Sequence, residues 1–126
     1  MVYCARYIKV KGIIANPIDR SIRMEIEFVV DTGAIYTMIP ESVARRLELK
    51  ETGKRKFKIA NGETVEYPVS EAYIILEGRG VTSLVVVGSE KVTPLLGVTT
   101  LELLGFEVDP ITRKLKPIEL MILGFN

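Results

Sequence analysis

The stretch of this sequence best suited to chemistry is Asp31-Thr32-Gly33-Ala34. It directly follows the apolar residues 28–30, so the sequence predicts a carboxylate at the end of a buried strand. Asp is depleted in strands, and an isolated buried carboxylate costs free energy unless a partner compensates it. We expect the strand to carry its acid into the core, and an acid in so unfavourable a place is a candidate for chemistry.

The composition narrows the kinds of chemistry that are available. The 126 residues include a single cysteine, Cys4, and no histidine. An intrachain disulfide, a cysteine metal cluster, imidazole metal ligands and nucleophiles activated by histidine are therefore excluded. A hydrolase built from this chain must work with carboxylates, lysine, tyrosine or a hydroxyl. We expect neither a metal nor a cofactor.

Charge and hydropathy exclude further classes of partner. Lys and Arg number 17 against 16 for Asp and Glu, a net charge of +1, and no basic tract accumulates that would favour nucleic acid. No apolar run approaches the roughly 20 residues that cross a bilayer, and residues 1–11 lack the apolar block of a signal peptide. We expect one domain over residues 1–126, located in the cytoplasm, with neither nucleic acid nor membrane as a partner.

The elements that must position Asp31 are mostly strands. Apolar and charged residues alternate over 22–28, which predicts a strand with one solvent-facing side. Further β-rich segments bring the expected total to about eight short strands, and two short helices are expected at about 40–49 and 98–104. Strands and helices do not alternate along the chain. The expected fold class is therefore mostly β, a single-domain, closed or barrel-like, largely antiparallel fold.

A hairpin is predicted around Asn61-Gly62, between strands at 56–60 and 64–69. Asn-Gly is the strongest signal for a two-residue type I′ turn, because both positions need a positive φ. The hairpin carries many polar side chains, so we expect it to project into solvent. A projecting hairpin can act as a lid.

The Asp-Thr-Gly-Ala sequence at 31–34 resembles the active-site signature of the aspartic proteases. The Leu-Leu-Gly sequence at 95–97 and its following helix resemble the second landmark of the retroviral-type, single-lobed members. Between the two landmarks this family places a flap hairpin, where Asn61-Gly62 stands here. The resemblance covers about residues 22–109, is closer to small microbial retropepsin-like proteins than to viral enzymes, and implies the retropepsin-like fold.

The resemblance implies an aspartic endopeptidase that acts on extended peptide or protein substrates with apolar side chains near the scissile bond. Two carboxylates that share one proton activate the water, since like charges about 3 Å apart cannot both ionise. The chain has three aspartates, Asp19, Asp31 and Asp109, and only Asp31 carries the signature. We therefore expect a homodimer in which Asp31 and its copy form the dyad on the two-fold axis.

Residue roles follow from the same resemblance. The catalytic set is Asp31, Thr32 and Gly33, in which the Thr32 side chain hydrogen-bonds to the partner's backbone and the Gly33 N–H donates to the Asp31 carboxylate. Ala34 is small enough for backbone or substrate to approach, and the flap tip closes over the bound peptide. Gly97 lets its segment pack against the catalytic loop, and the two leucines before it form a wall of the cleft or part of the core. The expected substrate-binding set is Ala34, Asn61, Gly62, Leu95, Leu96 and Gly97.

The sequence also departs from the viral pattern. Ile35 and Val98 stand where viral enzymes place an Asp and an Arg, so their supporting ion pair is absent and the support of the loop is unexplained. The chain also continues past the second helix, and its apolar tail at 118–126 is our candidate for a dimer contact. These departures leave an alternative open, a peptide-binding or assembly module that keeps the fold without proteolysis. Simpler roles also stay open: Asp31 as a turn residue, the hairpin as a surface turn, and the leucines as core.

Overall fold

Nine strands and two short helices make up residues 7–119, the part of the chain that the computed structural model describes. In chain order the elements are β1 (Tyr7–Ala15), β2 (Arg23–Asp31), β3 (Thr37–Pro40), α1 (Glu41–Arg46), β4 (Gly53–Lys58), β5 (Thr64–Leu76), β6 (Arg79–Gly88), β7 (Leu95–Leu96), α2 (Val98–Leu104), β8 (Phe106–Asp109) and β9 (Lys114–Pro117).

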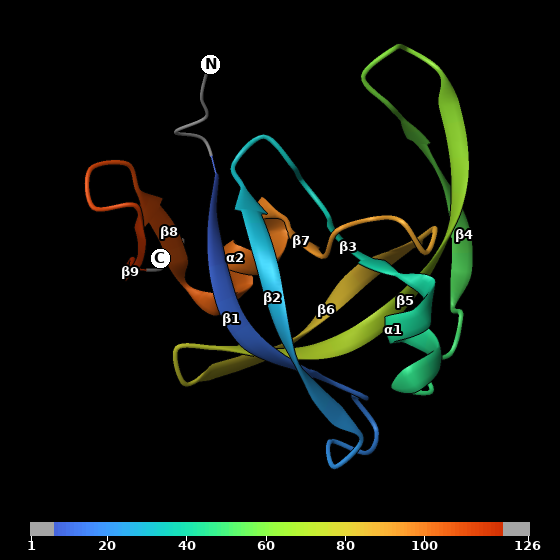
Figure 1. The fold of residues 1–126 in the computed structure, drawn as a ribbon, viewed down its shortest axis with the longest axis horizontal. Helices are drawn as coiled ribbons and strands as arrows, with labels where there is room; N and C mark the ends of the chain where they lie inside the picture. The colour runs from blue at the N-terminus through green and yellow to red at the C-terminus, as the bar shows by residue number, and fades with distance from the viewer. Residues whose placement is uncertain (1–6, 120–126) are drawn as a thin grey trace, which may run out of the picture.

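Six strands close into a ring through their pairings (Figure 1). The order is β1-β2-β7-β3-β6-β5, and β1 completes the ring by pairing with β5. Strand β4 extends the sheet beyond β5, and β8 and β9 form a separate two-stranded sheet. Most pairings are antiparallel, but β2–β7 and β3–β6 are parallel. The predicted fold class, mostly β with two short helices, is confirmed, and we describe the closed sheet as a ring of strands.

The core fixes the end of β2, the strand that carries Asp31. Phe28 and Val30 are fully buried, and the intervening Val29 is half-buried. Each large aliphatic or aromatic side chain buried in this way stabilises the fold by about 1.5–3 kcal/mol. The side chains that share the core with β2 come from the other ring strands, from both helices and from the segment after α1, and include Ile39, Leu47, Ile74, Leu96 and Leu101.

The first helix is shorter than predicted. Instead of spanning about 40–49, α1 ends at Arg46, because Glu48 adopts a left-handed conformation with φ 56°. The Leu49 N–H donates to the Ala44 carbonyl and the Glu48 N–H to the Arg45 carbonyl, both at 3.0 Å. This pair of bonds is the Schellman pattern that ends helices, with Glu at the position where Gly is usual. The expected extension to residue 49 was wrong for that reason.

The second helix has the predicted bounds. Helix α2 runs from Val98 to Leu104 and ends at Gly105, whose φ of 81° is the left-handed conformation expected of a glycine at this position. The Arg79 guanidinium donates to the carbonyls of Leu104 and Gly105 at 3.1 Å, which ties this helix end to β6. Within residues 7–119, neither helix is long and apolar enough to span a membrane.

The predicted hairpin is present, but its turn is different. Strands β4 and β5 project beyond the ring (Figure 1), and the Ile59 N–H donates to the Glu63 carbonyl at 2.9 Å. The loop therefore has three residues, 60–62, and positive φ occurs at Gly62 but not at Asn61. The expected type I′ turn was wrong, because the Asn61 side chain instead accepts the Glu63 N–H at 2.9 Å.

The prediction of a dimer contact at 118–126 falls mostly outside the described residues, which end at 119. Cys4 lies outside them as well.

Candidate active site

The Asp31 loop is a tight turn at the end of β2. The Gly33 N–H donates to the Asp31 carboxylate at 2.8 Å, and the Ala34 N–H donates to the Asp31 main-chain carbonyl at 3.0 Å. Two neighbouring strands hold the end of β2, since Asp31 is opposite Tyr7 of β1 and Val30 is opposite Leu96 of β7. The strand thus presents the carboxylate from a fixed backbone.

Asp31 lies at the surface end of its strand. Its side chain is half-buried, whereas Thr32 and Gly33 are exposed and Val30 is fully buried. The expectation that the strand carries its acid into the core was therefore wrong. The reason is that the pairing of β2 with β7 stops at Val30, so the next residue is covered on one edge only. Water and ligands can reach this carboxylate.

Helix α2 supports the loop from below. The Val98 N–H donates to the Ala34 carbonyl at 2.9 Å, and the Thr99 N–H donates to the Ile35 carbonyl at 3.0 Å. These are N–H groups of the first helical turn, which have no partner within a helix. The loop carbonyls therefore accept hydrogen bonds from N–H groups at the start of the helix, and these bonds hold the loop in position against the helix.

A chain of buried hydroxyl groups lies under the same loop. Thr37 Oγ1 is 2.6 Å from Thr100 Oγ1, which is 2.8 Å from Ser83 Oγ, and Thr37 Oγ1 accepts the Gly97 N–H at 3.0 Å. The three hydroxyl-bearing residues are at most 2% exposed. The chain joins β3, α2 and β6, and removal of one member would leave buried polar groups unpaired. Its one sign in the sequence is a threonine, Thr37, that precedes apolar residues.

The two leucines before Gly97 are not equivalent. Leu96 is fully buried and belongs to the core, so it offers no surface to a substrate. Leu95 is half-buried between Val29 of β2 and Met38 of β3. Two roles were expected for this pair, a wall of the cleft or a part of the core, and Leu96 is part of the core.

The hairpin contacts the loop that follows Asp31 through aromatic rings near the middle of the hairpin. The Phe57 ring packs edge-on against Tyr36 with 5.6 Å between centroids, and it lies 6.2 Å from Tyr67. A groove of about 450 Å³ separates loop and hairpin, lined by Gly33, Ile35, Tyr36, Arg55, Lys56, Phe57 and Lys58. Asn61 and Gly62 are exposed at the hairpin tip and do not line it. The sequence did not predict this aromatic contact, because aromatic side chains are common in ordinary strands.

The other two aspartates are engaged elsewhere. Asp19 lies in the turn before β2, at the opposite end of a nine-residue strand from Asp31, roughly 25–30 Å away. The Ser21 hydroxyl donates to its carboxylate at 2.6 Å and lowers the pKa of Asp19. The Asp109 carboxylate accepts the Ile111 N–H at 2.9 Å in its own turn. Within residues 7–119 the Asp31 carboxylate has no hydrogen bond other than that from Gly33, and no three acidic or cysteine side chains gather as a metal site.

One protein-family model matches a segment of this chain that contains both the Asp31 loop and the 95–97 segment. Residues 23–103 match the family model described as gag-polyprotein putative aspartyl protease. The chain belongs to this aspartyl protease family. The match spans the Asp31 loop, the hairpin and the 95–97 segment, which are the parts that carried the resemblance in the sequence. The predicted relationship is confirmed.

Solved structures of aspartyl proteases show the same fold. The EIAV protease in complex with the inhibitor HBY-793 is 20% identical, with a TM-score of 0.55 over 92% of this chain and 93% of that one. A retropepsin-like aspartic protease from Rickettsia conorii is 26% identical, with a TM-score of 0.52 over 82% and 89%. A foamy viral protease-reverse transcriptase is 20% identical, with a TM-score of 0.55 over 90% of this chain and 13% of that one. No curated protein sequence matches this chain significantly.

In this member of the aspartyl protease family, backbone hydrogen bonds support the loop where viral enzymes have the ion pair that is missing here. Ile35 and Val98 cannot form one, but their main chains take part in the bonds between the loop and α2. Gly97 closes the same contact, because a Cβ there would lie 2.4 Å from the Tyr36 carbonyl carbon. The loop support that the side chains left unexplained is therefore supplied by the main chain.

Proposed function

We propose that the protein is a homodimeric aspartic endopeptidase whose catalytic dyad is Asp31 of one protomer and its copy in the other. The observation that carries the proposal is the geometry of Asp31, an accessible family-signature carboxylate with no acidic partner found in its own described chain. A dyad needs a second carboxylate, and a second copy of this chain supplies one with the required symmetry.

The dyad would hydrolyse a peptide bond without a covalent intermediate. The ionised Asp31 takes a proton from a water molecule, whose oxygen attacks the carbonyl carbon while the protonated partner carboxyl donates its proton to the carbonyl oxygen. Asp31, now protonated, passes its proton to the amide nitrogen and the C–N bond breaks. One hydroxyl proton of the diol returns to the partner carboxylate, which gives a carboxylic acid, an amine and the original dyad. The Gly33 N–H, 2.8 Å from the Asp31 carboxylate, holds the carboxylate in position through these steps.

Thr32 is proposed to join the two loops. Its side chain is exposed and makes no hydrogen bond within residues 7–119, so its hydroxyl is free to donate to the partner's backbone. Ala34 gives a small surface beside the dyad. The apolar tail at 118–126 as a further dimer contact, and the cytoplasmic location, stay predictions.

The substrate is proposed to lie as an extended peptide in the groove between the catalytic loop and the hairpin. Exposed Ile35 and Tyr36 offer apolar surface there, which suits apolar side chains near the scissile bond. The tip at Asn61 and Gly62 would close over the bound peptide and exclude water, with Leu95 and Gly97 below.

The decisive experiment is the Asp31→Asn substitution, assayed with an unfolded protein as substrate. We expect the variant to fold and to lose cleavage by at least about a hundredfold, since it cannot supply acid–base catalysis. Wild-type activity should be greatest at acidic to neutral pH, because the reaction needs one carboxyl group that donates a proton and one carboxylate that accepts one. Asp19→Asn, which makes the same change in an exposed turn, is the control and should remain active.

Full activity of Asp31→Asn would contradict the proposal. A wild-type protein that binds peptides but cleaves none would instead favour the alternative of a peptide-binding or assembly module.

A further inference from the structure

We infer that Arg55 makes this groove selective for substrates that carry an acidic side chain beside apolar ones. The inference rests on the proposed function for the location of the substrate and adds its chemical class. It depends on three observations: the face of the hairpin on which Arg55 lies, the charges that line the groove, and the absence of an intrachain partner for the guanidinium within the described residues.

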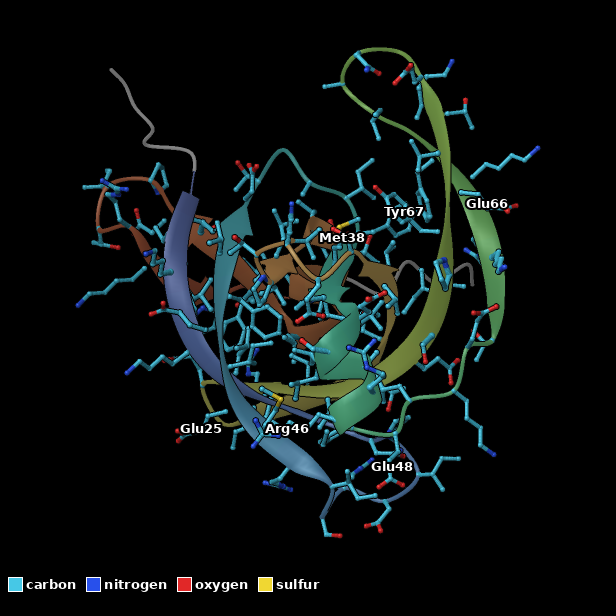
Figure 2. The ribbon with its side chains drawn as sticks, turned by 45° about the vertical axis from the view of Figure 1, so that its right-hand side comes forward. Glu25, Met38, Arg46, Glu48, Glu66 and Tyr67 are labelled. Atoms are coloured by element: carbon cyan, nitrogen blue, oxygen red, sulfur yellow. The ribbon has the colours of Figure 1, made fainter. Side chains whose placement is uncertain are left out.

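The strand register places Arg55 on the inner face of the hairpin. Arg55 is opposite Tyr67, and Phe57 is opposite Val65, and residues directly opposite or two apart share a face of a sheet. The Phe57 ring contacts Tyr36 of the catalytic loop, so this face is directed at the loop. Figure 2 shows Tyr67 on the side of the hairpin toward Met38, and Glu66 on the opposite side.

The lysines at 54, 56 and 58 alternate with Arg55 and Phe57 along the strand and so belong to its other face, although Lys56 and Lys58 also contribute to the groove lining. Lys54 is opposite Pro68, and Lys56 is opposite Glu66, which points away from the loop. Of these three lysines, Lys54 alone lies outside the groove lining. Arg55 is the residue of β4 that combines a charge with the inner, aromatic face.

All the charged residues that line the groove are cationic. They are Arg55, Lys56 and Lys58, and the lining contains no carboxylate. Arg55 is exposed and forms no ion pair within residues 7–119. The apolar part of the lining is also open, since Ile35 is 64% and Tyr36 39% exposed.

A peptide with neighbouring apolar and acidic side chains complements this lining. A guanidinium presents paired N–H donors that match the two oxygens of a carboxylate. A peptide bound in the groove would exclude water from the pair and strengthen it relative to an ion pair in free solution. Because a glutamate and a glutamine have nearly the same shape, a comparison of the two isolates the charge.

The test uses peptide pairs with apolar residues around the scissile bond, in which one glutamate is moved along the peptide and each version is compared with its glutamine counterpart. At one position or more, wild-type kcat/KM should be about three- to tenfold higher for glutamate. Arg55→Gln should bring that ratio close to one, and Arg55→Glu should reverse it in favour of a lysine peptide. High salt should reduce the wild-type ratio by screening.

Lys54→Gln is the matched control, because it removes the same charge from the adjacent residue on the outer face, and it should keep the wild-type ratio. The ratio is taken within each variant, so a general change of activity cancels. A wild-type ratio near one at every position, or a ratio that Arg55→Gln leaves unchanged, would overturn the inference.

A binding measurement separates this inference from the proposed function. Fluorescein-labelled glutamate and glutamine peptides are titrated with Asp31→Asn protein, with and without Arg55→Gln, and followed by anisotropy. Tighter binding of the glutamate peptide that requires Arg55 supports the inference even if wild-type protein cleaves neither peptide, which would refute only the endopeptidase. Equal binding of the two peptides, or no binding of either, would overturn it.

Discussion

Gly97 is the residue on which the position of the Asp31 loop depends most directly. Its φ of −89° is open to any amino acid, so the requirement for glycine is one of space. An added Cβ would lie 2.4 Å from the Tyr36 carbonyl carbon and 2.6 Å from the Ile35 carbonyl oxygen. Both are backbone atoms, which cannot rotate away as the end of a long side chain can.

Gly97→Ala should therefore push the loop away from the helix. We expect the free energy of unfolding to fall by about 1–3 kcal/mol, as for other overpacked sites, measured by urea denaturation. Peptide cleavage should fall further than the lost folded fraction explains, because Asp31 moves with its loop. Gly53→Ala is the control, since a Cβ there meets no atom within 4 Å. Equal stability and activity of the two variants would refute this role.

Some residues of the site could be predicted from the sequence and others could not. Asp31 stood out because its type conflicts with its place after apolar residues, and Gly97 because it follows two leucines. The hydroxyl contact of Thr37 joins residues 63 positions apart, and threonine is an ordinary strand residue, so its type carried no sign of a partner. The half-buried state of Asp31 depended on where a neighbouring strand ends, which the sequence of its own strand does not contain.

At the scale of elements, the two helices show what local signals can and cannot do. The bounds of α2 were predictable because Gly97 precedes it and Gly105 takes the left-handed conformation after it. Helix α1 ends at Arg46 because Glu48, two residues further on, is left-handed, and no glycine marks this stop. Asn16 stabilises that end by donating to the carbonyls of Leu47 and Glu48 at 2.9 and 3.2 Å. A contact from more than 30 residues away thus replaces the local signal.

Glu48→Gly should make the protein more stable. Left-handed backbone costs a residue with a Cβ roughly 1–2 kcal/mol, and the flexibility of glycine in the unfolded chain offsets part of the gain. We expect a net increase of about 0.5–1 kcal/mol in the free energy of unfolding. The Asn16 bond is kept, because its acceptor at residue 48 is a main-chain oxygen. Glu51→Gly, at an exposed residue without positive φ, should give no increase, and a loss of stability in Glu48→Gly would refute the account.

At the scale of the whole molecule, the ring joins segments that are distant in sequence. The parallel pairings of β2 with β7 and of β3 with β6 give no periodic signal of their own, so a largely antiparallel sheet was the most that alternation could predict. These pairings bring the Asp31 loop against α2 and leave Thr32, Ile35 and Tyr36 exposed. The folded chain thus builds one hydrogen-bonded loop that carries the Asp31 carboxylate, which is half of the proposed site.

If the site needs two copies of Asp31, an active chain should lose its activity when it pairs with an inactive one. Wild-type protein is mixed with a ninefold excess of Asp31→Asn and allowed to exchange subunits before peptide cleavage is measured. Random pairing leaves only about one tenth of wild-type chains in wild-type dimers, so activity per wild-type chain should fall by about tenfold. The same excess of Asp19→Asn keeps Asp31 in every chain and should leave activity per total chain unchanged. If the Asp31→Asn excess leaves activity per wild-type chain unaffected, in a mixture in which exchange is verified by mass-labelled subunits, then each chain completes its own site and the shared dyad is wrong.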